Sequence, residues 1–301
     1  MRIAILTQPL DTNYGGILQC YALQTFLERM GHEVQVLTKL RYGSSYYVVY
    51  SQPIEEAFLS FLGDASIKRI AYAASFGLDN CSEYSREQLE TCSCLLKKFN
   101  AVSVRESSGV ELCRNYFGVN AVQMLDPTLL LSVDDYRMLI DKVNTKSPQD
   151  NMLVYILDKT EEKIDLVNRI ASEKGLIPFW LDSPNEQNEN LSLDKQVKMS
   201  VEQWLCTFNN ASFVVTDSFH GCVFSILFHK QFVAVGNVER GLSRFSSLLN
   251  SFSISERLVT SVKDYENRKN ILNGDIDFEP IEKTLDELRG KSEFFIKKSI
   301  I

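Results

Sequence analysis

VVTDSFHGCVFSI, residues 214–226, joins a β-branched apolar run to a helical apolar pattern through three small polar residues. Such a run predicts a buried strand, and Thr216, Asp217 and Ser218 are residue types that favour the start of a helix. His220, one of three histidines, would then stand in the first helical turn. Because the first N–H groups of a helix lack partners and its dipole favours negative charge there, we expect an anion site at this junction.

The same alternation of strand, polar loop and helix extends in both directions from this junction. Its hydrophobic periodicity predicts strands at 2–7, 34–37, 68–73, 101–104, 122–125, 152–157, 177–181, 212–215 and 232–235. It predicts helices at 17–30, 53–62, 85–99, 110–117, 161–172, 201–208, 242–249 and 281–296. Strands that alternate with helices are typical of an α/β protein with parallel sheets.

Two αβ series follow one another along the chain, and Ser147-Pro148-Gln149-Asp150 stands between them. We therefore predict two Rossmann-like domains, residues 1–148 and 149–301, with a ligand cleft between them. The final helix, 281–296, is a candidate to pack back on the first domain.

Composition narrows the class of protein. The chain has 301 residues, and its 32 Lys and Arg against 39 Asp and Glu give a net charge of −7. A nucleic-acid partner is not expected for an acidic chain, and an anionic small ligand would need a local cluster of positive charge. The seven cysteines form no zinc pattern, so we expect small buried thiols in a reducing compartment and no metal. No apolar run reaches the roughly 18 residues of a membrane helix.

Arginines follow two other predicted strands at the edge where ligands of open α/β sheets bind. Arg105 comes after strand 101–104, and Arg240 and Arg244 come after strand 232–235. Arginine suits forked recognition of carboxylate or phosphate. The alternatives are an Arg105 salt-bridged to Glu106 or another neighbour, a solvated arginine pair on a helix face, and a His220 that only caps or fills its helix.

Asn13-Tyr14-Gly15-Gly16 leads into the first predicted helix. Glycines there would let a ligand approach the backbone closely. The loop has no G-x-G-x-x-G and no Walker lysine, so neither nucleotide fingerprint is present. His32 and His229 fall at predicted corners away from the binding edge, and we expect structural roles for them.

Several segments together resemble the polysaccharide pyruvyl transferase family. They extend in order over nearly the whole chain: Thr7-Gln8-Pro9, Asn13 to Gln19, Ala71 to Gly77, Ser103 to Glu106, Asp126-Pro127-Thr128, Asp217 to Gly221, and Gly236 to Phe245. The resemblance implies a GT-B-like fold. It also implies transfer of pyruvate from phosphoenolpyruvate to two hydroxyls of a sugar in a bacterial surface polysaccharide or its lipid-linked precursor, which forms a cyclic ketal.

The resemblance also implies site residues. Arg105 and His220 would contact phosphoenolpyruvate and act in catalysis, and Arg240 matches a basic residue of the family. We expect substrate-binding roles for Arg240, Arg244, Ser218, Gly221, Asn13, Gly15, Gly16 and Ser75. No cofactor is expected besides the donor substrate, and the location would be cytoplasmic, with peripheral association at the inner face of the membrane left open.

The chain departs from the family pattern at two places. Ser218 stands where many members have an arginine, so either Arg244 supplies that charge or the donor is bound less tightly. A Gly-Ser-Asp-Gln-Val-Trp-like segment has no match between Leu40 and Pro53. Two other functions therefore stay open: a GT-B glycosyltransferase that uses a nucleotide sugar, and a non-catalytic glycan-binding relative.

Overall fold

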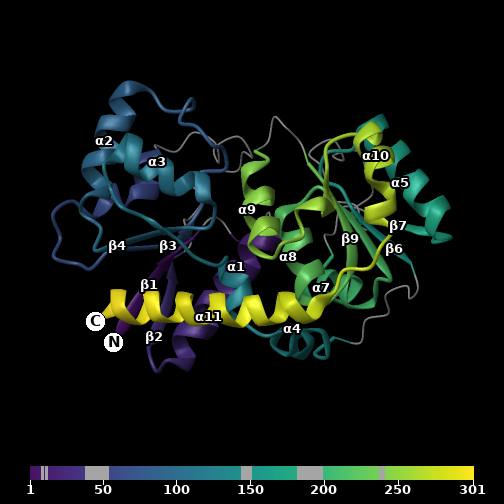
Figure 1. The fold of residues 1–301 in the computed structure, drawn as a ribbon. Helices are drawn as coiled ribbons and strands as arrows, with labels where there is room; N and C mark the ends of the chain where they lie inside the picture. Colours follow the sequence, from purple (N-terminus) through teal and green to yellow (C-terminus); the bar gives the residue numbers. More distant parts are fainter. Residues whose placement is uncertain (8–9, 11–12, 38–53, 144–150, 182–198, 237–240) are drawn as a thin grey trace, which may run out of the picture. The chain divides into compact units, whose positions relative to one another are not determined.

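The computed structural model describes residues 1–7, 10, 13–37, 54–143, 151–181, 199–236 and 241–301 (Figure 1). These residues form two compact units, which we describe separately. Unit 1 comprises Met1–Leu130 and Leu285–Ile301, and unit 2 comprises Leu131–Thr284.

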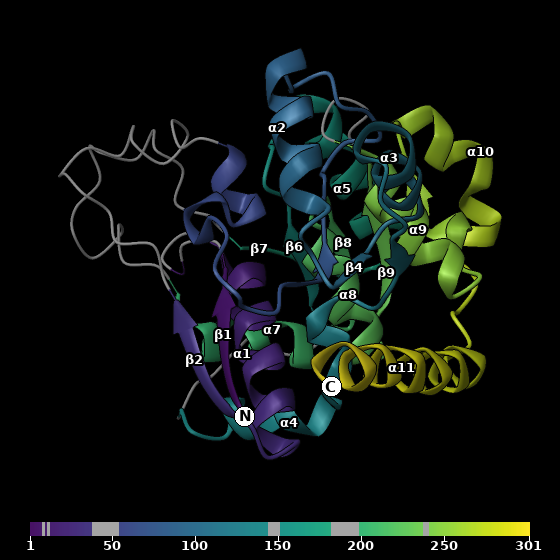
Figure 2. The same ribbon diagram turned by 90° about the vertical axis from the view of Figure 1, so that its left-hand side faces the viewer.

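Unit 1 begins with a βαβ arrangement. Strand β1 (Arg2–Leu6) pairs in parallel with β2 (Glu33–Leu37), and helix α1 (Tyr14–Arg29) connects them. Figure 2 shows α1 lying beside both strands. The helix begins three residues before the predicted start, because Asn13 caps it by accepting the N–H groups of Gly15 and Gly16.

A second parallel sheet of unit 1 consists of β3 (Ile70–Ala74), β4 (Ala101–Val104) and β5 (Val122–Gln123), with β4 in the middle. Helices α2 (Arg86–Leu96) and α3 (Ser107–Phe117) follow β3 and β4, respectively. Helix α3 begins three residues before its predicted start, directly after the Arg105-Glu106 pair. The arginine therefore lies at a junction between strand and helix.

One predicted helix of unit 1 is wrong in type. Of the predicted helix 53–62, the described residues 54–62 form two short 3₁₀ segments, Ile54–Phe58 and Ser60–Leu62, instead of an α-helix. Leu59 between them has a φ of 58°, in the left-handed region that interrupts a right-handed helix. A third 3₁₀ segment, Pro127–Leu130, follows the predicted turn at Asp126.

The long helix α11 (Phe278–Ile300) is part of unit 2 at its start and part of unit 1 at its end. In unit 1, Ile296 and Ile300 share a buried cluster with Ile5 and Leu27. The Leu125 N–H donates to the Ser292 hydroxyl at 3.2 Å. Apolar packing and a buried hydrogen bond thus dock the end of α11 on unit 1.

Unit 2 contains a five-stranded parallel sheet. Its strands are β6 (Met152–Tyr155), β7 (Pro178–Trp180), β8 (Phe213–Thr216), β9 (Gln231–Val235) and β10 (Leu258–Val259). They lie in the order β7-β6-β8-β9-β10. The predicted strand at 212–215 is therefore the central one, with neighbours on both sides.

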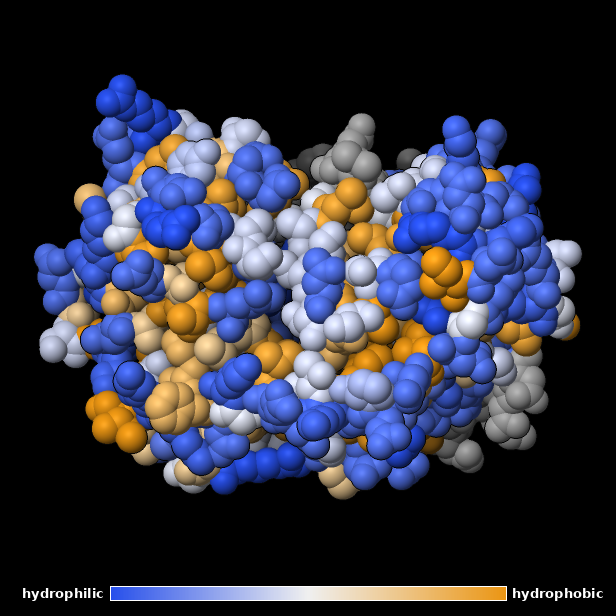
Figure 3. Space-filling view, in the orientation of Figure 1, coloured by the Kyte–Doolittle hydropathy of each residue, from blue (hydrophilic) through white to orange (hydrophobic). Residues whose placement is uncertain are grey.

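Helices cover both faces of this sheet. On one face α5 (Glu161–Lys174) and α10 (Val262–Leu272) pack on alternate strand residues such as Val154 and Val215. On the other face Tyr155 contacts Trp204 of α7 (Val201–Asn210), whose ring also meets Phe224 of α8 (Phe219–Leu227). The surface over α5 and α10 is mainly hydrophilic (Figure 3). The helices thus separate the sheet from water, as in doubly wound folds.

Unit 2 also includes elements that the sequence did not predict. Helix α4 (Val133–Ile140) precedes the sheet, and Tyr136 packs edge-on against Phe224 at 5.0 Å between ring centroids. This contact joins the segment after Leu130 to unit 2, so the division between units falls before the predicted boundary. The predicted boundary at 147–150 lies outside the described residues.

The α/β class with parallel sheets is confirmed. Helix α9 (Ser243–Ser251) corresponds to the helix predicted at 242–249. None of the described helices is both long and apolar enough to cross a membrane.

Candidate functional site

The sheet of unit 2 has a topological switch point between β6 and β8. From β6 the chain passes through α5 to β7 on one side, and from β8 it passes through α8 to β9 on the other. The two connections lie on opposite faces of the sheet. In open α/β sheets ligands bind at the carboxyl ends of the strands at such a point. The 214–226 stretch occupies this place.

The strand end and the helix start are packed closely at β8. The Thr216 hydroxyl donates to the Tyr155 carbonyl at 2.7 Å and accepts the Ser218 N–H at 3.1 Å. A Cβ added to Gly221 would lie 2.2 Å from the Thr216 Oγ1, so only glycine fits there. The Ser218 hydroxyl accepts the Gly221 N–H at 3.3 Å. The structure thus places Ser218 as the N-cap of α8 and Gly221 as the point of closest approach.

Asp217 connects this junction to the end of β6. Its carboxylate accepts the N–H groups of Leu157 at 2.6 Å and Asp158 at 3.2 Å. It also accepts Lys163 Nζ at 2.7 Å, and the two side chains are 4% and 10% exposed. A buried carboxylate needs such partners, because removing it from water is costly. The pair therefore neutralises the only acidic side chain of the junction and holds the β6–α5 loop against it.

His220 lies in the first turn of α8 and is 9% exposed. Its ring meets Phe219 edge-on at 5.2 Å, and Phe219 meets Phe245 of α9 at 6.4 Å. Arg244 precedes Phe245 in the first turn of α9 and is half-buried. The aromatic contact therefore brings the first turns of α8 and α9 together. That Arg244 forms a positive rim opposite His220 stays a prediction. Arg240 lies outside the described residues.

Cys222, two residues after His220, is fully buried. Burial raises the pKa of the Cys222 thiol well above its ordinary value, so the group stays neutral. Six of the seven cysteines are buried, as expected for most of them, and Cys94 is exposed. Within the described parts of the chain, no three His, Cys, Asp or Glu side chains form a group that could hold a metal ion.

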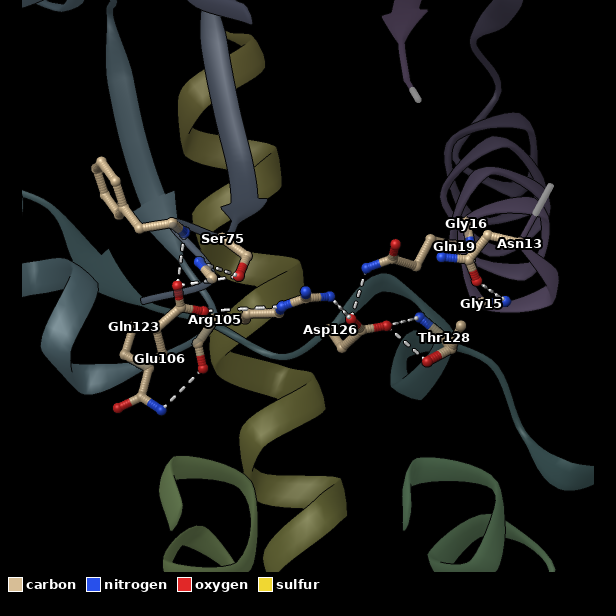
Figure 4. Close-up of polar contacts among 12 residues, drawn as sticks. Asn13, Gly15, Gly16, Gln19, Ser75, Arg105, Glu106, Gln123, Asp126 and Thr128 are labelled. Atoms are coloured by element: carbon tan, nitrogen blue, oxygen red, sulfur yellow. Dashed lines mark hydrogen bonds and ion pairs between the residues drawn. The ribbon is translucent and has the colours of Figure 1, made fainter. Parts of the chain in front are cut away.

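Arg105 of unit 1 lies directly after β4 and is paired with acids. Its Nη1 donates to Asp126 Oδ2 at 2.9 Å, and its Nε lies 3.7 Å from Glu106 Oε2 (Figure 4). The side chain is 10% exposed. Of the alternatives left open by the sequence, the structure shows the salt-bridged arginine. The two pairs hold the guanidinium in one position.

Asp126 is the hub of this network. It accepts the Thr128 N–H at 3.0 Å, the Thr128 hydroxyl at 2.6 Å, and the side-chain amide of Gln19 at 2.6 Å. Figure 4 shows the resulting chain of contacts from Arg105 through Asp126 to α1. The Asp-Pro-Thr segment and the Gln19 of the family-like motifs therefore meet at one carboxylate.

The other residues predicted to bind substrate in unit 1 have contacts of their own. The Asn13 side chain accepts the N–H groups of Gly15 and Gly16 at 2.9 and 3.4 Å. The Ser75 hydroxyl donates to Glu106 Oε1 at 3.0 Å and accepts the Gly77 N–H. In this structure the side chain of Asn13 occupies the place at the start of α1 that an anion would take.

Sequence reasoning missed Lys163 and the role of Asp126. Lys163 lies in the first turn of α5, where a positive charge is disfavoured by the helix dipole. That unusual position is a signal that an acidic partner faces it. The partner itself, Asp217, is 54 residues away and could not be identified from the sequence.

Comparison with known proteins adds a family and a fold. The sequence model described as polysaccharide pyruvyl transferase matches residues 13–239, more than half of the chain. The search of curated protein sequences found no match to this chain.

Two solved structures show the fold. UDP-GlcNAc 2-epimerase from Methanocaldococcus jannaschii has a TM-score of 0.54 at 11% identity, with 93% of both chains covered. S. aureus MnaA, in a structure with UDP, has a TM-score of 0.56 at 11% identity, with 96% of this chain and 90% of that chain covered. Likeness at this identity shows the fold alone, and it agrees with the GT-B-like class that we expected.

Proposed function

Because the chain belongs to the polysaccharide pyruvyl transferase family, we propose that it transfers pyruvate from phosphoenolpyruvate to a sugar as a cyclic ketal. The observation that carries the proposal is the position of His220 in the first turn of α8, at the switch point of the unit 2 sheet. A proton donor and a helix N-terminus at one strand end suit a donor substrate that carries a phosphate and must be protonated.

The proposed reaction has two additions at one carbon. A sugar hydroxyl attacks C2 of phosphoenolpyruvate and loses its proton, while C3 takes a proton and becomes a methyl group, so the first addition involves no net change in protons. The phosphate then leaves C2, and the second hydroxyl attacks C2 and loses its proton, which gives the ketal and inorganic phosphate. We assign the proton on C3 to His220, and the steps use no metal ion and no cofactor besides the donor.

Positive groups near His220 would bind the phosphate of the donor. The dipole of α8 favours an anion at its first turn. Arg244 lies in the first turn of the neighbouring helix, so it is our candidate for the charge that Ser218 lacks. Asp217 is already paired with Lys163, and its negative charge therefore does not repel the donor strongly.

Arg105 is our candidate for a second contact to phosphoenolpyruvate. A guanidinium has five N–H donors, so an arginine held by Asp126 and Glu106 can also bind a ligand carboxylate. Asp126 and Glu106 offset much of the positive charge that Arg105 would present to the donor. For that reason we expect Arg105 to orient the donor more than to attract it.

We further propose that the acceptor is a bacterial surface polysaccharide or its lipid-linked precursor, modified in the cytoplasm or at the inner face of the membrane. The family description names a polysaccharide, which supports a glycan acceptor.

The test measures phosphate released from phosphoenolpyruvate with a panel of glycan acceptors. His220→Ala should lower the rate by about 10²–10⁴-fold, the usual contribution of a general acid. His229→Ala is the matched control, because that histidine is partly exposed and pairs with Glu282. Melting temperatures of both variants show whether the fold is kept. Unchanged turnover in His220→Ala would refute its role.

A thermal-shift comparison separates the alternatives. Stabilisation by phosphoenolpyruvate supports the proposal, whereas stabilisation only by a nucleotide sugar supports a glycosyltransferase. Glycan binding without phosphate release across the whole panel supports a non-catalytic relative.

A further inference from the structure

A pocket with several charged residues in its lining lies in unit 1, at the amino ends of β3 and β4. It has a volume of about 500 Å³, and its lining includes Lys68, Arg69, Lys98 and Asn100. Arg69 and Asn100 directly precede the two strands, whereas Ser75 and Arg105 directly follow them. At about 3.3 Å per residue the five residues of β3 separate the two ends by roughly 15 Å. The pocket is therefore distinct from the Arg105 network.

Arg69 is the central group of the pocket. It is 3% exposed, and its Nη2 donates to the Gly63 carbonyl at 2.8 Å. Its backbone N–H donates to the Asn100 side chain at 2.9 Å, which fixes the base of the side chain. The Nη1 atom is buried and has no hydrogen-bond partner among the residues that the structure describes. Nη1 has almost no exposed surface, so in this conformation the guanidinium acts on a ligand in the pocket through its positive charge.

Two lysines add positive charge to the same pocket. Lys68 Nζ donates to the Ile300 carbonyl at 3.0 Å, and Lys98 Nζ donates to Asp64 at 2.7 Å. Asp64 is the one acidic residue of the lining, and its side chain is 96% exposed. The hydrogen bond from Lys98 holds the pKa of Asp64 below its usual value. Asp64 therefore stays ionised and competes with any anion for Lys98.

We propose that this pocket binds a phosphorylated small molecule of about the size of a sugar phosphate. Three cations against one solvated carboxylate select an anion, and an arginine with two lysines suits a phosphate group. The volume falls within the roughly 300–1,000 Å³ of small-molecule sites and leaves room for more than the phosphate alone. Asn100 and Ser66 supply polar groups for the hydroxyls of the ligand.

The first experiment titrates glucose 6-phosphate into the full chain by calorimetry at low salt, with glucose as the neutral probe. We expect saturable binding of the phosphate ester and none of glucose. The double variant Lys68→Met/Lys98→Met should weaken binding by about tenfold or more, as expected for losing charge-assisted contacts. Lys291→Met, an exposed lysine of α11 in the same unit, is the matched control and should bind as the wild type does. Equal binding by the double variant, or no binding by the wild type, overturns the proposal.

Two further variants separate binding in this pocket from a loss of folding and from binding at the His220 junction. Asp64→Asn removes the competitor for Lys98 and should tighten binding by about threefold or more, which a loss of folding could not mimic. His220→Ala should leave the affinity unchanged, because His220 belongs to the other proposed site. Loss of binding in His220→Ala would assign the phosphate to that junction and refute the pocket. Failure of the pocket would leave the proposed transferase reaction untouched.

Discussion

The junctions Val104–Gly109 and Thr216–Gly221 have the same local plan in the two units. Each begins with the last residue of a central parallel strand and reaches the third residue of a helix. In each, a glycine packs against that last strand residue. The residue after the strand is Arg105 in one and Asp217 in the other, and the second helical residue is Ser108 in one and His220 in the other.

The two junctions differ in how the charge after the strand is balanced. Arg105 is countered by two carboxylates, whereas Asp217 is countered by one lysine and two backbone N–H groups. Glu106 lies beside Arg105 in the sequence, but Asp126 and Lys163 lie outside the two stretches, so neither balance of charge can be judged in full from its own stretch. A strand followed by a helix provides the place for a site, and partners from distant elements decide its electrostatics.

The largest stability effect is expected from the buried pair of unit 2. Lys163→Met leaves Asp217 without its counter-charge, and removal of one partner of a buried pair costs about 3–5 kcal/mol of unfolding free energy. The double variant Lys163→Met/Asp217→Asn should recover part of this loss, because no unpaired charge remains. Urea unfolding measures both. A loss below about 1 kcal/mol in Lys163→Met would show that the pair behaves as an exposed one.

The two glycines should respond differently to a methyl group. In Gly221→Ala the new Cβ would lie 2.2 Å from Thr216 Oγ1, and we expect a loss of about 3 kcal/mol from overpacking. In Gly109→Ala the nearest atoms are Val104 carbons at 3.2 Å, and we expect about 1 kcal/mol. Gly290→Ala, with nothing within 4 Å, is the control and should be neutral or stabilising. Equal losses at Gly221 and Gly109 would contradict the difference in packing.

Removal of helix caps should have a smaller and similar effect in both units. Ser218→Ala in unit 2 and Asn13→Ala in unit 1 each remove the acceptor for helix N–H groups, at a cost of about 1 kcal/mol. Asn13→Asp keeps an acceptor and should lose little. Thermal unfolding with all three variants checks this. A cost at Asn13→Asp as large as that at Asn13→Ala would argue against capping.

The last effect is a loss of stability that is confined to alkaline pH and absent at neutral pH. Burial raises the pKa of the Cys113 and Cys92 thiols of unit 1 to about 11. Above the ordinary pKa of 9.0 the unfolded chain releases these protons while the folded chain keeps them, so stability falls as pH rises from 9 to 11. Cys113→Ala should flatten this fall, and replacement of the exposed Cys94 by serine should not. Unfolding midpoints at pH 8, 9.5 and 11 give the slopes, and identical slopes in Cys113→Ala would refute this origin.

The limits of helices and strands were predicted correctly where a capping residue or a clear apolar run marks them. Strand β4 matches its predicted limits, and the starts of α5 and α7 match as well, because Thr160 and Ser200 cap them. The start of α3 was missed, since its N-cap Glu106 makes no side-chain capping bond and gives no such signal. The 3₁₀ segments at 54–62 were read as an α-helix because apolar spacing does not show the left-handed Leu59.

The sequence by itself determined the alternation of strands and helices, the buried strand before Asp217 and the place of His220 in a first helical turn. Periodicity, capping and glycine act over a few residues, so these features can be read locally. Only the tertiary structure decided the strand order that makes β6 and β8 a switch point, and only it paired Lys163 with Asp217 and Arg105 with Asp126. Those contacts join residues from 21 to 54 positions apart, and their energy depends on burial, which no single stretch of sequence contains.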